Sequence, residues 1–437
     1  MNEHALRKPG RFPVTPLNNP LHPDRLNGKD TVFVFLAFAA AYFCSALLRA
    51  ITATLAPVLT QEFALQAQSL GLLAGGYFLG FAAVQLPLGT WLDRHGPKQV
   101  ILGFLSLAVL GCLAFSVANS FAALLAARVL VGMGVGACLM AALTGYRRWF
   151  DPATLLRANS WMLMTGSLGM LASTLPVQWL MPLMGWRPLF WLLAGLILLS
   201  MAAIAVIVPR WRVSPPISPA LSAPDVAVAA EEAGYAPIWR SRYFRKMAPL
   251  AFFNYGGMVA MQTLWAGPWM IRVAGYTPLE SATGLFWINA CMLVTFWSWG
   301  MVNPWLARHG WHATRLIAWG VPLSLAVLAF NILGGASTGA AGWALFCVTS
   351  SVMGLAQPAV GMSFRAALAG RALSAYNLVI FAGVFFAQWS LGLLIDGFAA
   401  LGLSPVVSFQ AAMGVFLCCG MAAYAGFVAL KADNSPQ

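Results

Sequence analysis

The hydrophobic positions of this chain are gathered into long runs that are separated by short polar segments. Most runs extend for about 20 residues or more, the length that an α-helix needs to cross the roughly 30 Å hydrocarbon core of a bilayer. The pattern predicts an all-α membrane protein with twelve transmembrane helices. The predicted spans are 31–59, 70–91, 99–118, 121–146, 158–184, 188–209, 247–271, 281–303, 315–335, 339–364, 372–395 and 405–430.

The composition agrees with this pattern and excludes a large soluble protein. The 437 residues are 60% hydrophobic and 8% charged, with a mean hydropathy of +0.77, whereas soluble domains carry roughly 25% charged residues. The sequence shows no glycine-rich phosphate-binding loop and no nucleotide-binding domain, so we expect neither enzymatic activity nor drive by ATP. The five histidines lie in the tail and in predicted loops. We therefore expect no cofactor and no metal site.

The basic residues fall mostly on one side of the predicted membrane. With the amino terminus in the cytoplasm, all but four of the 25 lysines and arginines lie in cytoplasmic segments, as the positive-inside rule requires. Arg187 and Arg272 lie in outer loops, whereas Arg49 and Arg128 lie within spans. The net charge of +13 is therefore a topology signal, and no nucleic-acid partner is needed to explain it. Both termini are predicted to be cytoplasmic, with no cleaved signal segment.

The chain is predicted to be a duplicated unit of six spans. Its longest polar stretch is rich in proline, serine and alanine, which suits a flexible linker. Two landmarks recur across this stretch at an offset of 211 residues: Pro57 matches Pro268, and Gly89 matches Gly300. Repeated halves of this kind occur in many membrane folds. The predicted parts are a cytoplasmic tail (1–30), a six-helix bundle (31–209), a cytoplasmic linker (210–246), a second six-helix bundle (247–430) and a short cytoplasmic tail (431–437).

Arg49 is the candidate for chemistry, because it lies in the middle of the first span. A lone cation at mid-membrane costs from a few to more than ten kcal/mol unless it faces water or an anion. Every aspartate and glutamate of the chain lies in a loop, in a tail or at the edge of a span. The position 211 residues later is Ala260, so the duplicated fold does not require a cation there. We infer a functional role, with bonding to backbone carbonyls as the alternative.

The loop between spans 2 and 3 indicates a family. Its sequence, GTWLDRHGPK, resembles the signature of the major facilitator superfamily, and RVLVGMGVG in span 4 resembles the second signature of that family. The resemblance implies two six-helix bundles that rock about a central site, and a cytoplasmic latch that holds the outward-facing state. The residues that it assigns to the latch and to coupling are Gly89, Asp93, Arg94, Gly96, Lys98 and Arg128. For Arg128, a coupling or structural role is favoured over substrate contact.

A closer resemblance concerns the substrate. The segment LLRAITATLAP is similar to span 1 of the organophosphate:phosphate antiporter branch, where an arginine at this place binds the substrate anion. That branch has a second arginine in span 7, which this chain lacks. A carboxylate or another organic anion held by Arg49 is therefore expected. The further candidates for the substrate site are Tyr42, Gln85, Asn254, Tyr255, Gln262, Trp265, Asn289 and Gln357.

The predicted function is secondary transport of a small anionic organic solute by alternating access in the bacterial inner membrane. The alternatives are an efflux carrier for a drug-like or siderophore-like metabolite and, more remotely, a receptor that does not transport. Span 5 lacks the adjacent Gly-Pro pair of drug:proton antiporters. The expected partners are the small-molecule substrate and the lipid bilayer, with a coupling proton or a counter-anion left open, and the expected functional unit is a monomer.

The driving force is predicted from the acidic residues. Proton-coupled carriers commonly use a membrane-embedded carboxylate or histidine, and none lies at mid-span here. Glu62 and Asp396, at the outer ends of spans 1 and 11, are expected to be ordinary interface carboxylates. We therefore expect anion exchange, or uptake of a partly protonated anion.

Overall fold

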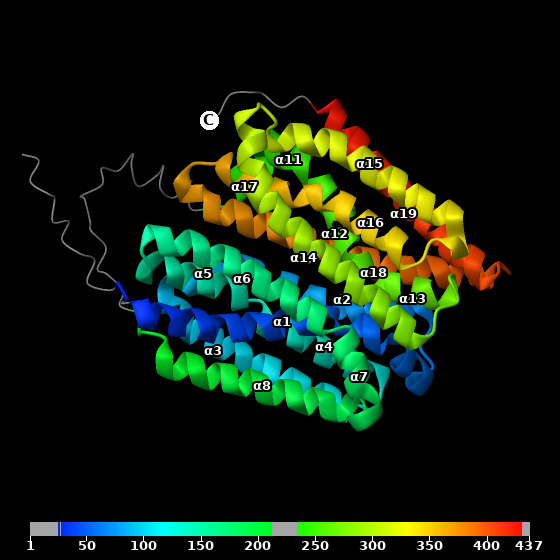
Figure 1. The fold of residues 1–437 in the computed structure, drawn as a ribbon, viewed down its shortest axis with the longest axis horizontal. Coiled ribbons are helices and arrows are strands. Elements are labelled where there is room, and N and C mark those ends of the chain that lie inside the picture. The colour runs from blue at the N-terminus through cyan, green and yellow to red at the C-terminus, as the bar shows by residue number, and fades with distance from the viewer. Residues whose placement is uncertain (1–24, 27, 212–233, 431–437) are drawn as a thin grey trace, which may run out of the picture.

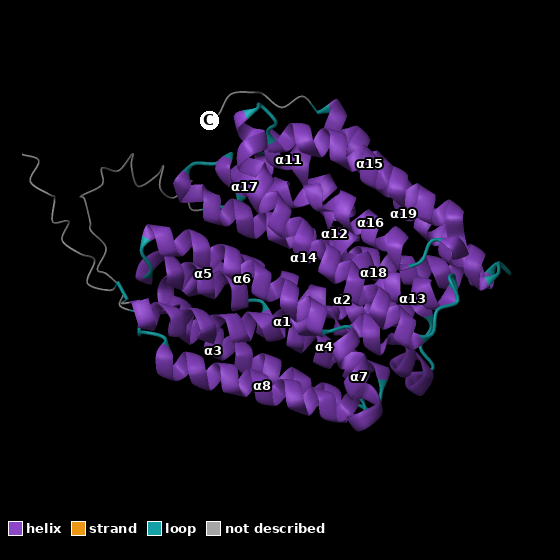
Figure 2. Cartoon of the chain, in the orientation of Figure 1, coloured by secondary structure: helices purple, strands orange, loops and turns teal. Residues whose placement is uncertain are grey.

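The structure is a computed structural model that describes residues 25–26, 28–211 and 234–430. All regular elements in these residues are helices (Figure 2). Nine of these helices are long and apolar enough to cross a membrane. The expected tails and most of the linker lie outside the described residues.

The first half of the chain forms one bundle (Figure 1). Its elements correspond in order to the first six predicted spans. They are α1 (Gly28–Phe63), α2 (Ala67–Ala83), α3 (Gln85–Val117), α4 (Phe121–Val135), α5 (Cys138–Trp149), α6 (Pro152–Ala172), α7 (Leu175–Met184) and α8 (Trp186–Ile207).

The second half forms the other bundle and corresponds to the last six spans. Its elements are α10 (Ala236–Arg240), α11 (Arg242–Leu250), the π-helical η1 (Ala251–Tyr255), α12 (Gly256–Ala260), the π-helical η2 (Met261–Trp265), α13 (Ala266–Arg272), α14 (Pro278–Arg308), α15 (Ala313–Gly334), the short 3₁₀ turn η3 (Gly335–Ser337), α16 (Ala340–Ser350), the 3₁₀ segment η4 (Ser351–Leu355), α17 (Ala356–Met362), α18 (Ala366–Ala400) and α19 (Pro405–Ala429).

Spans 2, 5 and 7 are divided into shorter helices, so they are not among the nine long ones. Span 2 is interrupted at Val84, between α2 and α3, and span 5 is interrupted before Pro176 at the start of α7. A proline lacks the N–H that would continue the hydrogen-bond ladder of the preceding turn. Span 7 contains the π-helical segments η1 and η2. Such segments are frequent at functional sites.

Two predicted boundaries need correction. The expected loop at Gly89–Lys98 is helical, because α3 runs through it with a break at Gly96, where φ is +75°. The Trp211 side chain packs directly on Gly96, so a larger residue there would collide with the indole. The end of the predicted linker (210–246) is also helical. Helix α10 lies within it, and α11 begins within it and continues into the predicted seventh span.

Small residues bring α2 and α4 into close contact. Gly80 lies against the carbonyl of Val129, and Gly132 lies against the backbone of Tyr77. Glycines spaced four apart allow this approach of helices in a membrane. The consequence for the site is that Tyr77 and Arg128 lie side by side.

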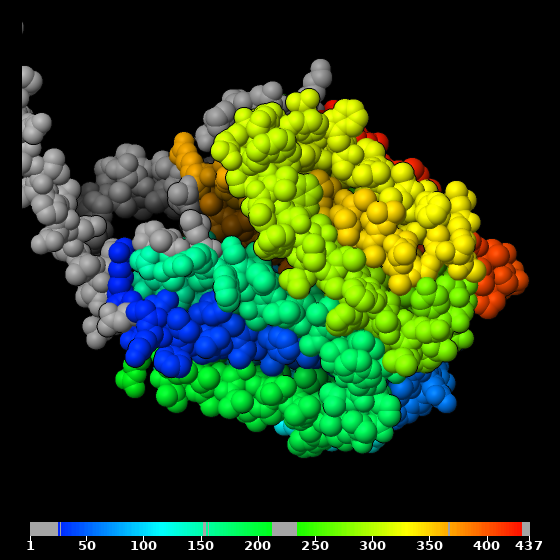
Figure 3. Space-filling view, viewed as in Figure 1, coloured from blue at the N-terminus to red at the C-terminus, as the bar shows by residue number. Residues whose placement is uncertain are grey.

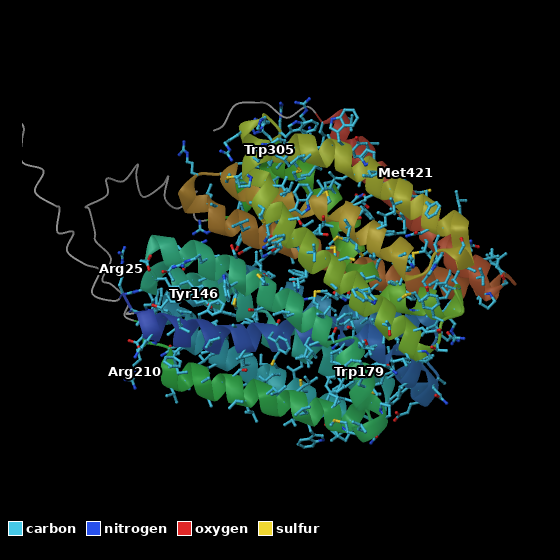
Figure 4. All side chains as sticks on the ribbon, in the orientation of Figure 1. Arg25, Tyr146, Trp179, Arg210, Trp305 and Met421 are labelled. Atoms are coloured by element: carbon cyan, nitrogen blue, oxygen red, sulfur yellow. The ribbon has the colours of Figure 1, made fainter. Side chains whose placement is uncertain are left out.

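The two ends of the molecule differ. We call the end where α1 begins and α8 ends the basic end; Figure 4 labels Arg25 and Arg210 there. At the opposite end the bundles are joined, because Gly71 and Gly75 of α2 lie against α18, and α14 packs on α6 and α7. At the basic end, α5 packs on helices of its own bundle and α17 does likewise. Figure 3 shows a hollow at this end between the teal helices of the first bundle and the yellow-green end of α14.

Candidate functional site

Arg49 lies where the two bundles meet. Its guanidinium carbon is 5.7 Å from the ring centre of Phe81 on α2 and 5.8 Å from that of Phe381 on α18. The two rings are themselves in contact, with centres 4.4 Å apart. An arginine near aromatic faces gains about 0.5–2 kcal/mol from the ring quadrupoles. Arg49 is half-buried, so part of its surface is free of protein contacts.

Three phenols complete the surroundings of Arg49. Tyr77, Tyr42 and Tyr255 all interact electrostatically with its guanidinium. Tyr42 and Arg49 are seven residues apart and therefore lie on one face of α1. Tyr77 lies one turn before Phe81 on α2, and its hydroxyl donates to the Ser45 carbonyl at 3.0 Å. We call these six residues (Arg49, Tyr42, Tyr77, Phe81, Tyr255 and Phe381) the arginine site.

The guanidinium of Arg49 has a hydrogen-bond donor without an acceptor among the described residues. Its Nε is buried, and no described residue accepts a hydrogen bond from it. Among the described residues, none of its nitrogens donates to a backbone carbonyl, which was the alternative derived from the sequence. Buried donors are normally satisfied, and each unsatisfied one costs about 1–3 kcal/mol. The exposed part of the guanidinium can therefore take an oxyanion, and the partly exposed ring of Phe381 lies beside it.

The carboxylates at the outer ends of spans 1 and 11, Glu62 and Asp396, are already engaged. Glu62 accepts from Trp186 Nε1 at 2.7 Å and from Arg187 at 2.5 Å. Asp396 on α18 accepts from the backbone N–H groups of Ala67 and Gln68, at 3.1 and 2.6 Å. These bonds place neither carboxylate at the arginine site. They also show that Asp396 does more than an ordinary interface carboxylate, because it ties the second bundle to the first.

Arg128 has a different environment. Only 1% of its surface is exposed. Its Nη1 donates to the Leu48 carbonyl at 3.0 Å, and its guanidinium carbon is 5.2 Å from the ring centre of Tyr77. Arg128 thus joins α4 to α1 and packs on the ring that lies beside Arg49. This geometry suits the coupling or structural role predicted for it.

Of the other predicted substrate contacts, only Tyr42 and Tyr255 lie at the arginine site. Gln262 donates to Asn289 at 3.0 Å, and Trp265 donates to the Gln388 carbonyl at 3.1 Å. These bonds pack helices of the second bundle together. Two of the remaining three are also held locally, since Gln85 donates to the Phe81 carbonyl and Gln357 donates to Asn377. Asn254 lies beside Gly420, and its buried Oδ1 has no hydrogen-bond partner among the described residues.

The predicted latch residues lie at the basic end. Asp93 and Arg94 are exposed, and neither has a hydrogen bond or ion pair within the part of the chain that the structure describes. Lys98 donates to the Val208 carbonyl at 2.7 Å, within its own bundle. Gly89 has open space around it, whereas Gly96 lies under Trp211. The role of these residues as a latch stays a prediction.

The end of the linker contacts the first bundle near these residues. Tyr235, which precedes α10, donates its hydroxyl to the Leu86 carbonyl at 3.1 Å. Burial raises the pKa of this phenol, and the nearby Arg371 opposes that shift in part. The hydroxyl therefore keeps its proton and remains a donor at neutral pH.

Sequence reasoning missed Tyr77, Phe81 and Phe381. The first two lie in the stretch GGYFLGF of span 2, whose glycines signal close helix contact. A tyrosine in such a stretch was a usable signal. Phe381 carries no comparable signal, because its proximity to Arg49 depends on how the second bundle docks on the first.

Solved structures with the same fold are membrane transporters. A bacterial homolog of the human lysosomal transporter Spinster, in an inward-facing and unoccupied conformation, aligns over 92% of this chain and 97% of its own, with a TM-score of 0.73 and 18% identity. A D-xylose-proton symporter aligns over 93% of this chain and 99% of its own, with a TM-score of 0.74 and 13% identity. At these identities the likeness shows the fold alone.

The helices, the paired bundles and the signature segments define a multi-pass membrane protein. The sequence profile of the Major Facilitator Superfamily matches residues 38–388. This chain belongs to that superfamily, as its signature segments predicted. The resemblance of span 1 to the organophosphate:phosphate antiporter branch stays a prediction.

Two curated relatives match parts of the chain. The 4-hydroxybenzoate transporter PcaK of Pseudomonas aeruginosa is 31% identical over 150 residues, which are 34% of this chain and 33% of the relative. The 3-(3-hydroxy-phenyl)propionate transporter of Escherichia coli is 27% identical over 235 residues, which are 52% of this chain and 54% of the relative. The matches thus span about a third and about half of the relatives' lengths.

Proposed function

We propose that this protein is a secondary transporter of aromatic carboxylates. The observation that carries the proposal is the arginine site, where a guanidinium with no carboxylate partner among the described residues lies against the rings of Phe81 and Phe381. A guanidinium binds a carboxylate through two parallel hydrogen bonds, and aromatic rings pair favourably in offset or edge-to-face contacts. A small ring that bears a carboxylate satisfies both requirements.

The named substrates of the two relatives support this substrate class. Both 4-hydroxybenzoate and 3-(3-hydroxyphenyl)propionate combine an aromatic ring with a carboxylate. Both also carry a phenolic hydroxyl. In this chain, Tyr42 and Tyr255 offer hydroxyls near Arg49 that would suit such a group.

Alternating access would act through latches at the two ends. Asp396 joins α18 to the start of α2 at the opposite end, and this contact favours the state in which that end is closed. Asp93, at the basic end, is exposed and has no ion-pair partner among the described residues, as expected of a latch that forms only when the basic end closes. We infer that the two carboxylates stabilise opposite conformations of the transport cycle.

The orientation is part of the proposal. The basic residues of the described helix ends, such as Arg25 and Arg210, lie at one end (Figure 4), and the positive-inside rule assigns that end to the cytoplasm. The protein would then lie in the bacterial inner membrane with both termini inside. The state with the opposite end closed would be inward-facing.

The test is uptake of labelled 4-hydroxybenzoate into proteoliposomes that contain the purified protein. We expect saturable uptake by the wild type, and only the background of empty liposomes with Arg49→Ala. The Arg272→Gln protein, which lacks an exposed arginine away from the site, should match the wild type. Equal uptake by wild-type and Arg49→Ala proteoliposomes would refute the proposal.

A further inference from the structure

A groove runs along the outside of the first bundle, between α1 and α8. It has a volume of about 340 Å³. The α1 side is formed by positions from Phe33 to Cys44, and the α8 side by positions from Leu196 to Ile207. Several of these side chains, including Leu36 and Leu199, are exposed. The groove is separate from the arginine site, since none of the six residues of that site lines it.

The dimensions of the groove match one leaflet of a bilayer. Each side covers eleven helical steps, or about 16 Å at 1.5 Å per residue. Half of the roughly 30 Å hydrocarbon core is about 15 Å. The two helices run in opposite directions, so Phe33 and Ile207 lie towards the basic end while Cys44 and Leu196 lie near the middle of the membrane.

The lining of the groove is apolar along its whole length, from the basic end to the middle of the membrane. Ser200 is the one hydroxyl among the lining residues, and its Oγ is already bonded to the Leu196 carbonyl at 2.9 Å. The inner part of the groove therefore suits a hydrocarbon chain and offers nothing to a polar head group.

Positive charges continue both faces of the groove at the basic end. Lys29 lies one turn before Phe33 on α1, and Arg210 follows Ile207 at the end of α8. Both side chains are exposed, and so is the acidic Asp30 beside Lys29. Lys98, whose Nζ donates to the Val208 carbonyl at 2.7 Å, adds a third cation at this end, so the charges there are positive in sum. Residues three or four apart lie on one helix face, so Lys29 extends the α1 side of the groove towards the head-group region. Cations near the membrane surface attract anionic head groups.

We propose that this groove binds one anionic phospholipid of the leaflet at the basic end. One acyl chain lies between α1 and α8, and the phosphate of the head group contacts Lys29 and Arg210. Burial of the chain supplies affinity for any phospholipid. The two cations supply the preference for a negatively charged one.

The charge arm of the test compares phosphatidylglycerol with phosphatidylcholine of the same acyl chains. Retention of each lipid on the purified full-length protein is measured by native mass spectrometry over a range of lipid concentrations. The wild type should prefer phosphatidylglycerol. In the Lys29→Gln/Arg210→Gln protein, the ratio of the affinities for phosphatidylglycerol and phosphatidylcholine should fall about fivefold for each charge removed, or about 25-fold in all.

The control for charge is Arg147→Gln, which removes an exposed cation of α5 that lies outside the groove. It should leave the preference for phosphatidylglycerol unchanged. An equal loss with Arg147→Gln, or no loss with the double variant, would mean that the lipids follow overall charge and would overturn the proposal.

The groove arm uses Ala203→Trp, which fills the groove, and Ala202→Trp, which adds the same side chain at an exposed neighbour outside it. Only Ala203→Trp should abolish retention of both lipids. Retention that is the same in these two proteins would show that the bound lipid lies elsewhere. Free glycerol phosphate should not displace the lipid, because it lacks the acyl chain.

Discussion

Two arginines lie in the membrane-spanning part of the first bundle, Arg128 in its interior and Arg49 where it meets the second bundle, and their neighbours give them different roles. Arg128 is almost fully buried and bonded to the Leu48 carbonyl. Arg49 is half-buried and lies beside two aromatic rings and three phenols. Both arginines have buried nitrogens without an acceptor among the described residues, Nε in Arg49 and Nε and Nη2 in Arg128, so the exposed part of Arg49 is what distinguishes it. Both lie against Tyr77, so a ligand that moves this ring would affect both.

The first prediction concerns Arg49→Lys. A lysine keeps the charge but loses the planar fork that matches a carboxylate. Binding of 4-hydroxybenzoate should weaken by about 10- to 150-fold, which corresponds to the 1.5–3 kcal/mol of charged hydrogen bonds. Titration calorimetry of the purified protein measures this effect. The Arg272→Gln control should bind normally, and unchanged affinity in Arg49→Lys would show that the guanidinium does not hold the carboxylate.

The second prediction concerns the ring of Phe381. Phe381→Leu should weaken binding of benzoate by about 3- to 10-fold while leaving an aliphatic carboxylate such as hexanoate unaffected, because only the aromatic pairing of about 0.5–1.5 kcal/mol is lost. The matched control is Phe386→Leu, an exposed position of the same helix. Equal losses for both ligands would mean that Phe381 only shapes the site.

At the scale of helices, the contact between α18 and α2 closes one end of the molecule. A carboxylate that accepts from two N–H groups at a helix start is favoured by both the hydrogen bonds and the helix dipole. Asp396 makes this contact across the two bundles. Glu62 makes comparable bonds within one bundle. Only the first contact can bias the relative position of the bundles.

The third prediction follows from that difference. Asp396→Asn should shift the conformational equilibrium about 5- to 30-fold towards opening of the opposite end, since about 1–2 kcal/mol of capping is lost. Electron–electron distances between spin labels at Gln61 and Leu401, which are exposed on different bundles, should lengthen. Glu62→Gln should leave the distances unchanged, and Asp93→Asn should not lengthen them. If the distances in the Asp396→Asn protein equal those of the wild type, Asp396 does not act as a latch.

The helices also show which features of the fold and the site could be predicted from the sequence. Hydropathy predicted the nine spans that are long apolar helices in the described residues, because the bilayer sets the length of each apolar run. It did not predict the breaks in spans 2, 5 and 7, since these depend on local backbone bonding. Arg49, Tyr42 and Tyr255 were found because polar groups are rare in spans. Phe81 and Phe381 were not found, because a phenylalanine in an apolar run carries no signal until the bundles are docked.

At the scale of the whole molecule, the described residues place no free carboxylate beside the arginine site. Glu62 and Asp396 are both engaged at the opposite end. A fixed cation between the bundles makes the empty carrier costly to reorient, and a bound anion reduces that cost. We therefore expect anion exchange, or entry of the substrate together with its own proton.

The fourth prediction tests this driving force. In proteoliposomes without internal substrate, an imposed pH gradient should not drive accumulation of benzenesulfonate, an aromatic anion that stays charged. Internal benzoate should accelerate its entry by exchange. Strong accumulation driven by the pH gradient alone, and lost in Glu62→Gln or Asp396→Asn, would identify that carboxylate as a proton carrier.

The most direct measurement is the binding of benzoate and of benzamide to the wild-type protein. The two ligands have nearly the same shape, but only benzoate carries the negative charge that Arg49 is proposed to hold. Benzoate should bind at least about tenfold more tightly, because hydrogen bonds to charged groups are worth about 1.5–3 kcal/mol, and Arg49→Ala should abolish the difference. Equal affinities in the wild type, or a preference for benzoate that survives Arg49→Ala, would contradict the assignment of the arginine site as the place where the substrate anion binds.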